Sequence, residues 1–304
     1  MSSGLSDGIS IGVDIGGSHI TAAQVSQEGS TIIPGTKVRL KVDPHADAES
    51  VINRWAEAIS VLCNGNNNSA IKVGIAMPGP FDYTRGISLI KGMNKYEALY
   101  GLDVRSQLSD ALGIKPENIL FRNDAEAFLH GEVMHCKLPP TARVIGVTLG
   151  TGLGSAKSSE GITSDVFRAI TPMHDGIAED YISTRWFQKR CFELTSKELS
   201  NVEALLNHDD VILKDTLFNE FGDNLGRFLN AFATDEQADT IIIGGNIAKS
   251  MHVFVNYVTE QLNNKNITLK QSVLWEDAAL IGAACSWPLV DTAKGLDDKL
   301  VTSY

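Results

Sequence analysis

IGVDIGGSHITAAQV, residues 11–25, is the stretch that decides how this chain folds. An apolar run carrying Asp14 leads into the turn Gly16-Gly17-Ser18, and a second β-prone run follows, which is typical of a β-hairpin. Glycine lets backbone N–H groups approach a bulky anion because no Cβ stands in the way. The stretch therefore predicts a phosphate-binding hairpin, in which Asp14 could hold a cation or a water. A plain hairpin turn is the alternative interpretation.

A second glycine-rich stretch, RVIGVTLGTGLGSAK, occupies residues 143–157. Again an apolar strand meets a glycine turn and a β-compatible run follows. The turn residues are Gly150, Thr151, Gly152 and Gly154. Residues 145–150 can be laid over residues 11–16, although the internal similarity is weak. It predicts two related halves, each with a strand, a phosphate turn and a strand.

In the rest of the chain, segments with the apolar spacing of a strand alternate with segments that have the spacing of a helix. The predicted strands cover residues 31–33, 37–42, 71–76, 118–121 and 240–243, and the predicted helices cover 47–62, 103–112, 177–192, 212–232, 247–262 and 277–287. Strands followed by helices, twice over, favour two α/β domains with mixed sheets. We expect a smaller domain of residues 1–122 plus 288–304, and a larger one of residues 123–287.

Composition narrows the class of protein. The chain has 304 residues, is 43% hydrophobic and carries a formal net charge of -11, so a nucleic-acid partner is not expected because phosphate contacts need clustered Lys and Arg. Its four cysteines are far apart, which indicates neither a zinc knuckle nor a disulfide framework. The start lacks the features of a signal peptide, and no apolar run approaches the ~20 residues of a membrane span. We therefore expect a cytoplasmic protein with no membrane partner.

Two further sites follow strand ends. Asp124 comes just after a predicted strand and Asn123, where a carboxylate can project into a cleft and act as a general base. An N-cap for the following helix is an equally good interpretation of Asp124 from the residues alone. Gly244-Gly245 lies between a predicted strand and a predicted helix, where a plain turn would also fit.

Seven motifs, taken together and in order, resemble the ROK family of sugar kinases in the actin-like, hexokinase-type ATPase superfamily. They are VDIGGSHI, AMPGP, the region around Asn94, RNDAEAF, GVTLGTGLG, IIIGGN and AALIGAA. The resemblance covers most of the chain. It implies an α/β fold with two actin-like (ribonuclease H-like) domains, mixed sheets and an interdomain cleft, with ATP and Mg²⁺ as cofactors.

The resemblance also implies roles for the residues at the matching motifs. Asp124 would be the catalytic base, and Asp14 would hold Mg²⁺ through a bound water. The residues implied for phosphate and nucleotide are Asp14, Gly16, Gly17, Ser18, Gly150, Thr151, Gly152, Gly154, Gly244 and Gly245. Those implied for the sugar are Gly79, Asn94, Asn123, Asp124 and Glu179. Without the resemblance, Gly79 is only part of a Pro-Gly turn and Asn94 an exposed loop residue.

One stretch departs from the family pattern. ROK kinases usually carry a Gly-Glu-x-Gly-His segment and then a cysteine-rich zinc motif after the second glycine turn, whereas residues 158–179 are shortened and contain no cysteine. No structural zinc is therefore expected. Glu179 matches the glutamate that follows the zinc cysteines and contacts sugar. His174 lies on the shortened segment, and we expect it on the surface, although it could replace the missing histidine.

The resemblance implies ATP-dependent phosphorylation of a glucose-like hexose at its 6-hydroxyl. An N-acetylhexosamine or fructose kinase is the alternative within the same class. A non-catalytic sugar- or nucleotide-binding sensor is the alternative from a different class. The expected partner is a small-molecule sugar, and the resemblance also allows a homodimer.

Overall fold

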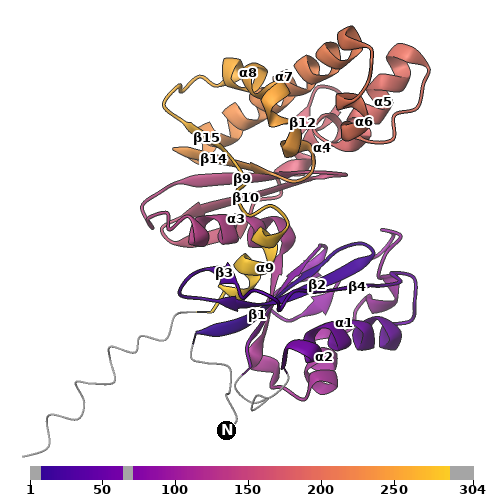
Figure 1. Cartoon of the computed structure of the whole chain (residues 1–304), viewed down its shortest axis with the longest axis vertical. Helices are drawn as coiled ribbons and strands as arrows, with labels where there is room; N and C mark the ends of the chain where they lie inside the picture. The colour runs from indigo at the N-terminus through magenta and orange to yellow at the C-terminus, as the bar shows by residue number, and fades with distance from the viewer. Residues whose placement is uncertain (1–7, 64–70, 288–304) are drawn as a thin grey trace, which may run out of the picture. The chain divides into compact units, whose positions relative to one another are not determined.

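The computed structural model describes residues 8–63 and 71–287 (Figure 1). The chain forms two compact units. The first holds the described residues of Met1–Ile75, Pro80–Phe121 and Ala283–Tyr304, and the second holds Ala76–Gly79 and Arg122–Gly282. The predicted domains, 1–122 with 288–304 and 123–287, stay a proposal, because residues 288–304 lie outside the described part.

The first unit is built on a sheet with strand order β3-β2-β1-β5-β8, in which β4 also pairs with β2. Its strands are β1 (Ile9–Ile15), β2 (His19–Ser26), β3 (Thr31–Ile32), β4 (Val38–Lys41), β5 (Val73–Met77) and β8 (Ile119–Asn123). β1 and β2 are antiparallel, with Ile15 opposite Ile20, which confirms the hairpin predicted from residues 11–25. A short hairpin of β6 (Phe81–Asp82) and β7 (Ile87–Ser88) follows β5.

Two α-helices of the first unit begin and end as their sequences predict. α1 (Ala48–Cys63) buries Trp55 and Ile59, four residues apart, on the face that packs near β2. α2 (Val104–Leu112) begins at Asp103, whose carboxylate accepts the N–H of Ser106 at 2.9 Å. It ends at Gly113, where φ is 64°, a left-handed conformation that glycine adopts readily. The 3₁₀ turns are η2 (Glu97–Leu99) and η3 (Pro116–Asn118).

The second unit is built on a sheet with strand order β11-β10-β9-β14-β15. The strands are β9 (Val144–Leu149), β10 (Leu153–Ser159), β11 (Ile162–Asp165), β14 (Thr240–Gly244) and β15 (Thr268–Gln271). β9, β10 and β11 are antiparallel while β9, β14 and β15 are parallel, so the sheet is mixed, as predicted. Gly244 pairs with Thr148. The turns after β9 and β14 therefore leave the sheet at the same edge.

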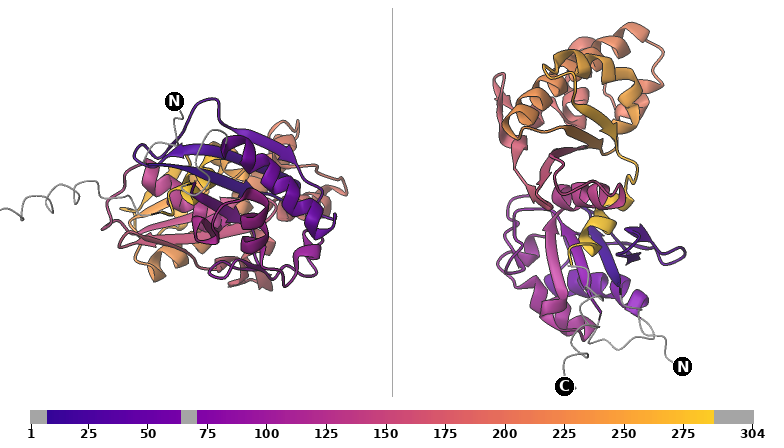
Figure 2. Two further views of the ribbon diagram at one scale, coloured as in Figure 1. Left: turned by 90° about the horizontal axis from the view of Figure 1, so that it is seen from below. Right: turned by 90° about the vertical axis from the view of Figure 1, so that its left-hand side faces the viewer.

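Helices cover both faces of this second sheet (Figures 1 and 2). They are α3 (Asp124–His135), α4 (Ala178–Tyr181), α5 (Thr184–Thr195), α6 (Val202–Leu206), α7 (Val211–Asp235), α8 (Met251–Gln261) and α9 (Asp277–Ala284), with 3₁₀ turns η4 (Arg168–Ile170) and η5 (Ile247–Ser250). Ile241 and Ile243 belong to the core shared with α5, α7 and α8, whereas Ile242 packs with Phe128 of α3. Burial on both faces explains the unbroken apolar run of β14.

The predicted single helix over residues 177–192 is wrong, because the chain forms α4 and α5 instead. Ile182 and Ser183 separate the two helices, and Ser183 has extended backbone angles, φ −155° and ψ 168°. Both residues are fully buried. The N–H of Thr184 donates to the carbonyl of Gly150 at 2.8 Å instead of continuing α4. A contact with the second glycine turn therefore replaces one turn of helix.

The crossing of α3 and α9 depends on two glycines (Figure 2). An ideal Cβ on Gly131 of α3 would lie 2.0 Å from the carbonyl oxygen of Ala278, and one on Gly282 of α9 would lie 1.8 Å from that of Ala127. Only glycine permits this approach. In the part of the chain that is described, no helix is both long enough and apolar enough to cross a membrane.

Candidate functional site

The first glycine turn joins β1 to β2 in the first unit. The N–H of Gly16 donates to the carbonyl of His19 at 2.9 Å, and the N–H of Val42 donates to the carbonyl of Ser18 at 2.9 Å. Gly16, Gly17 and Ser18 are exposed. Within the described residues, the N–H groups of Gly17 and Ser18 find no acceptor. Two neighbouring amides are thus available to an anion.

Gly17 and Gly150 are glycines that the fold itself does not require. An ideal Cβ on either residue meets nothing within 4 Å. Neither residue has a positive φ, so neither backbone conformation needs glycine. Both positions therefore leave room for a molecule to approach the backbone from outside.

Other protein groups hold the second turn, between β9 and β10. The carbonyl of Gly150 accepts the N–H of Thr184 at 2.8 Å and its hydroxyl at 3.0 Å. The Oε2 atom of Glu179 accepts the N–H of Leu153 at 2.9 Å. A Cβ on Gly152 would lie 2.5 Å from the same Oε2 atom. A side chain on Gly152 would therefore displace the carboxylate of Glu179, whereas one on Gly150 in the same turn would displace nothing.

Glu179 lies beside the second turn at the start of the short helix α4. Its Oε1 atom forms an ion pair with Arg185 of α5 at 2.5 Å, while Oε2 binds the turn. Both carboxylate oxygens thus already accept hydrogen bonds from the protein. Each oxygen has a second lone pair, so the carboxylate can still accept a hydroxyl from a bound molecule.

Asn123, rather than Asp124, caps α3. The Oδ1 atom of Asn123 accepts the N–H groups of Ala125 at 2.8 Å and Glu126 at 3.3 Å, and the residue is buried. Asp124 is exposed at the first position of the helix. A Cβ on Gly154 would lie 2.8 Å from the Cβ of Ala125. The start of α3 therefore lies against β10, directly after the second glycine turn.

The turn after β14 packs against the end of β9. Gly245 has a φ of 84°, and a Cβ there would lie 2.4 Å from the carbonyl oxygen of Leu149. A Cβ on Gly244 would lie 2.3 Å from the ring of Phe128. The fold alone thus accounts for both glycines. Because Gly244 pairs with Thr148 on β9, the two glycines lie next to the second turn.

The structure divides the sequence-predicted residues between the two units. Those in the first unit are Asp14, Gly16, Gly17, Ser18 and Asn94, and those in the second are Gly79, Asn123, Asp124, Gly150, Thr151, Gly152, Gly154, Glu179, Gly244 and Gly245. Asn94 is exposed with a φ of 54°, and its N–H donates to Oε1 of Glu97 at 2.9 Å. Two residues later, the hydroxyl of Tyr96 donates to the carbonyl of Gly16 at 2.6 Å. None of the sequence motifs indicates a role for Tyr96.

Two acidic residues near the start of α3 were also missed. Arg122 pairs with Oε1 of Glu126 at 3.2 Å, and the N–H of Asp165 donates to Oε2 of Glu126 at 3.3 Å. Burial raises the pKa of Glu126, and Arg122 opposes that shift. Burial also raises the pKa of Asp165, although this carboxyl accepts the N–H of Phe167 at 3.0 Å. The shortened segment, residues 158–179, therefore carries a carboxyl group that is costly to ionise.

Replacing Asp165 by asparagine is expected to stabilise the protein at pH 7. The carboxyl of Asp165 has a higher pKa in the folded protein than in the unfolded one. Between these two pKa values the folded state binds more protons, so the protein loses stability as the pH rises through this range. Asparagine keeps the acceptor without the charge. We expect the Tm of Asp165→Asn to rise by about 1–3 °C at pH 7 and this gain to disappear at pH 4. The exposed control Asp209→Asn should leave the Tm unchanged at both pH values. A Tm that falls at pH 7 would contradict this assignment.

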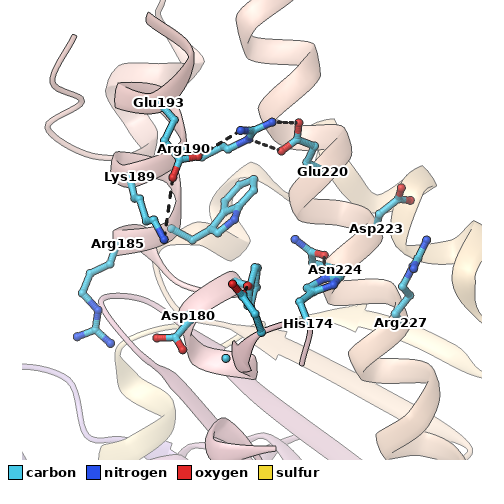
Figure 3. Close-up of a pocket in the computed structure, with 14 residues that line it drawn as sticks. His174, Asp180, Arg185, Lys189, Arg190, Glu193, Glu220, Asp223, Asn224 and Arg227 are labelled. Atoms are coloured by element: carbon cyan, nitrogen blue, oxygen red, sulfur yellow. Dashed lines mark hydrogen bonds and ion pairs between the residues drawn. The ribbon is translucent and has the colours of Figure 1, made fainter. Parts of the chain in front are cut away.

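A cavity of about 950 Å³ opens between α5, α7 and the hairpin of β12 (Pro172–Met173) and β13 (Gly176–Ile177) (Figure 3). His174 lines it, with Nε2 lying 2.9 Å from Oδ1 of Asn224 and the ring packed edge-on against Tyr181. Arg190 pairs with Glu220 at 2.7 and 2.9 Å. Because cations and carboxylates are mixed around it, the cavity does not favour an anion such as phosphate.

The described residues contain no group of three or more His, Cys, Asp and Glu side chains that could hold a metal ion. A single carboxylate suffices for Mg²⁺ at a phosphate site, because Mg²⁺ keeps most of its waters and takes one or two carboxylates. Asp14 lies half-buried near the end of β1, three residues before the first of the two available amides. The first turn therefore fits a hydrated Mg²⁺ beside a phosphate.

Comparison with known proteins identifies the class and then the family. Over 91% of this chain, the structure is similar to a ROK hexokinase from Thermus thermophilus (TM-score 0.72, 18% identity, 97% of that chain). It is also similar to a ROK family glucokinase from Streptomyces griseus in complex with glucose and AMPPNP (TM-score 0.69, 21% identity, 91% of this chain and 98% of that one). These likenesses show the fold, an actin-like ATPase fold with mixed sheets.

The family assignment comes from the sequence. The family model described as the ROK family matches residues 10–164. The chain is also 30% identical over 151 residues to a glucokinase from Thermotoga maritima, an alignment that covers 50% of this chain and 44% of that protein. The matched part thus spans less than half the length of the curated relative. The chain belongs to the ROK family.

Proposed function

We propose that this protein is an ATP-dependent sugar kinase that transfers the γ-phosphoryl group to the 6-hydroxyl of a glucose-like hexose. The observation that supports this most is the pair Gly17 and Gly150. Both are glycines without a conformational or packing need for glycine, and they occupy equivalent turns in the two units. A ligand that approaches the backbone closely, as a phosphate does, explains both.

In the proposed reaction, Asp124 accepts the proton of the sugar hydroxyl. The hydroxyl oxygen forms a bond to the γ-phosphorus as the bond from that phosphorus to the bridging oxygen breaks, and ADP leaves with the electron pair. Asp124 suits this role because Asn123 already caps α3. Its position at the first turn of α3 also favours a negative charge. The carboxylate is exposed.

The glycine turns would bind the phosphates. In the first turn the N–H groups of Gly17 and Ser18 have no acceptor among the described residues. In the second turn Gly150 and Thr151 occupy the equivalent place, with Gly244 and Gly245 beside them for the adenosine. Asp14 would hold Mg²⁺ through water. When bound, Mg²⁺ neutralises part of the charge on the β- and γ-phosphates.

The proposed sugar ligands come from the matched motifs. Gly79, Asn94, Asn123 and Glu179 are the proposed ligands, besides Asp124. Since Oδ1 of Asn123 caps α3, Asn123 would contribute its amide nitrogen as a donor. Glu179 would contribute a carboxylate that Arg185 and the second turn already orient.

Replacing Gly17 by alanine tests the proposal. Because a Cβ there meets nothing within 4 Å, we expect a free energy of unfolding within about 0.5 kcal/mol of the wild type. The KM for ATP is expected to rise roughly tenfold or more, because the Cβ displaces a phosphate from charge-assisted hydrogen bonds. Gly152→Ala is the matched contrast, since it should lower the Tm by displacing Glu179. An unchanged KM for ATP in Gly17→Ala would remove the main support.

A coupled assay of ADP release with a panel of sugars distinguishes the alternatives. We expect turnover with glucose to exceed that with fructose, mannose, N-acetylglucosamine and N-acetylmannosamine. Preference for an acylated sugar would instead favour an N-acetylhexosamine kinase. Calorimetric binding of sugar without turnover would favour a sensor. The cytoplasmic location and the homodimer stay predictions.

A further inference from the structure

Tyr96 is a buried tyrosine in an unfavourable backbone conformation. Its φ is 52° and its side chain is fully buried. A bulky residue rarely adopts a left-handed conformation, and such strain persists only where the surroundings impose it. Asn94, two residues earlier, has a φ of 54°. This short loop is therefore held in a specific shape.

Three contacts hold Tyr96 in place. Its N–H donates to the carbonyl of Pro44 at 2.7 Å, and its ring packs edge-on against Trp55 with the centroids 5.3 Å apart. Its hydroxyl donates to the carbonyl of Gly16 at 2.6 Å, across 80 residues of sequence. The last contact reaches directly into the first glycine turn.

This contact fixes one peptide plane of the turn. The carbonyl of Gly16 and the N–H of Gly17 belong to the same planar trans peptide group, so they point in opposite directions. A hydrogen bond that holds the carbonyl toward Tyr96 therefore keeps the N–H of Gly17 pointing away from it. Gly17 is exposed. Without this bond, a flexible glycine peptide could rotate and present its carbonyl oxygen, which repels phosphate.

We propose that Tyr96 is a positioning residue that orients the Gly17 amide toward the nucleotide phosphates. This inference rests on the proposed function, and it adds a residue that the ROK motifs quoted above do not include. Tyr96 also follows Asn94 by two residues, so the same loop joins the proposed sugar ligand to the phosphate turn.

The ionisation of Tyr96 is consistent with this role. Burial raises the pKa of its hydroxyl to about 12; Trp55 opposes the shift and the negative charge of Asp14 adds to it. The hydroxyl therefore remains a donor throughout the neutral and moderately alkaline range. It can hold the Gly16 carbonyl whatever the charge on the bound phosphates.

Tyr96→Phe removes only the hydroxyl oxygen, and Tyr100→Phe is the matched control, because Tyr100 lies in the same loop region and is exposed. Calorimetry would measure the affinities for ATP and for adenosine, alongside steady-state kinetics and thermal unfolding. We expect ATP to bind about five- to tenfold more weakly to Tyr96→Phe, with the affinity for adenosine and the KM for sugar within twofold of the wild type. Tyr100→Phe should match the wild type throughout.

The outcomes separate a positioning role from a structural one. An unchanged ATP affinity, or an equal loss for ATP and adenosine, would overturn the inference. A double variant with Gly17→Ala adds a second test: because both changes act on one peptide group, their effects on ATP affinity should be less than additive, and full additivity would contradict the proposal. A wild-type protein that binds ATP but phosphorylates no sugar would contradict the proposed function while leaving the Tyr96 result interpretable.

Discussion

Replacing Asp124 by asparagine is expected to lower kcat by about 10²- to 10⁴-fold, the usual contribution of a general base. Asparagine has the same shape, and the cap of α3 is carried by Asn123, so the helix should begin at the same residue. The KM values for ATP and sugar should therefore stay within about threefold of the wild type, because binding contacts remain. Steady-state kinetics under saturating substrate measure both quantities.

Glu49→Gln is the control for Asp124→Asn, because Glu49 is an acidic residue in the first turn of α1. Both substitutions remove a negative charge from a helix N-terminus, which costs about 0.3–1 kcal/mol of stability. Only the Asp124 variant should lose activity. If Asp124→Asn kept more than about a tenth of the wild-type kcat, Asp124 would not be the base.

The second large effect is expected from Gly131→Ala and Gly282→Ala at the crossing of α3 and α9. Each added Cβ would lie within 2.0 Å of a backbone carbonyl oxygen on the other helix. Backbone atoms cannot move aside as the end of a flexible side chain can, so we expect each variant to lose about 3 kcal/mol or more of its free energy of unfolding. Chemical denaturation measures this loss.

Gly150→Ala is the control for this pair, since its Cβ meets nothing within 4 Å and the stability without ligand should be unchanged. α3 also carries Asp124 at its first position. A Gly131 or Gly282 variant that still folds should therefore lose activity as well, because α3 has to shift. Stability within about 0.5 kcal/mol of the wild type for both variants would contradict the observed helix crossing.

Local patterns predicted most of the elements. The hairpin of β1 and β2 follows from two β-prone runs around a glycine turn, and β14 follows from three consecutive isoleucines. The break between α4 and α5 could not be predicted, because it depends on a hydrogen bond from Thr184 to Gly150, 34 residues earlier. Sequence periodicity continues across that break although the backbone does not.

Gly150 and Gly152 also differ in a way that depends on a residue distant in the sequence. Sequence alone treats Gly150 and Gly152 as equivalent members of one turn. The structure separates them, since Glu179 occupies the space beside Gly152 while Gly150 faces open space. Only the fold shows which of the two glycines has a neighbour in the space that a Cβ would take.

Sequence motifs supplied the candidate site residues, whereas a residue held by a single distant contact had no motif to indicate it. Asp124 and Asn123 were both found, but which of them caps α3 became clear only from the hydrogen bonds of Asn123. Tyr96 reaches Gly16 across 80 residues, and no local pattern signals that contact. Asp165 is the last residue of β11, and this strand was not among those predicted from the sequence. The catalytic and ligand roles of the predicted residues stay predictions.

The central claim is that this chain phosphorylates a hexose with ATP. Phosphorus NMR of the protein with Mg²⁺, ATP and glucose follows the reactants and products directly. We predict a growing hexose 6-phosphate signal, matched one to one by ADP and absent when glucose is omitted. Glucose that binds by calorimetry but yields no sugar phosphate, with ATP intact, would contradict the claim.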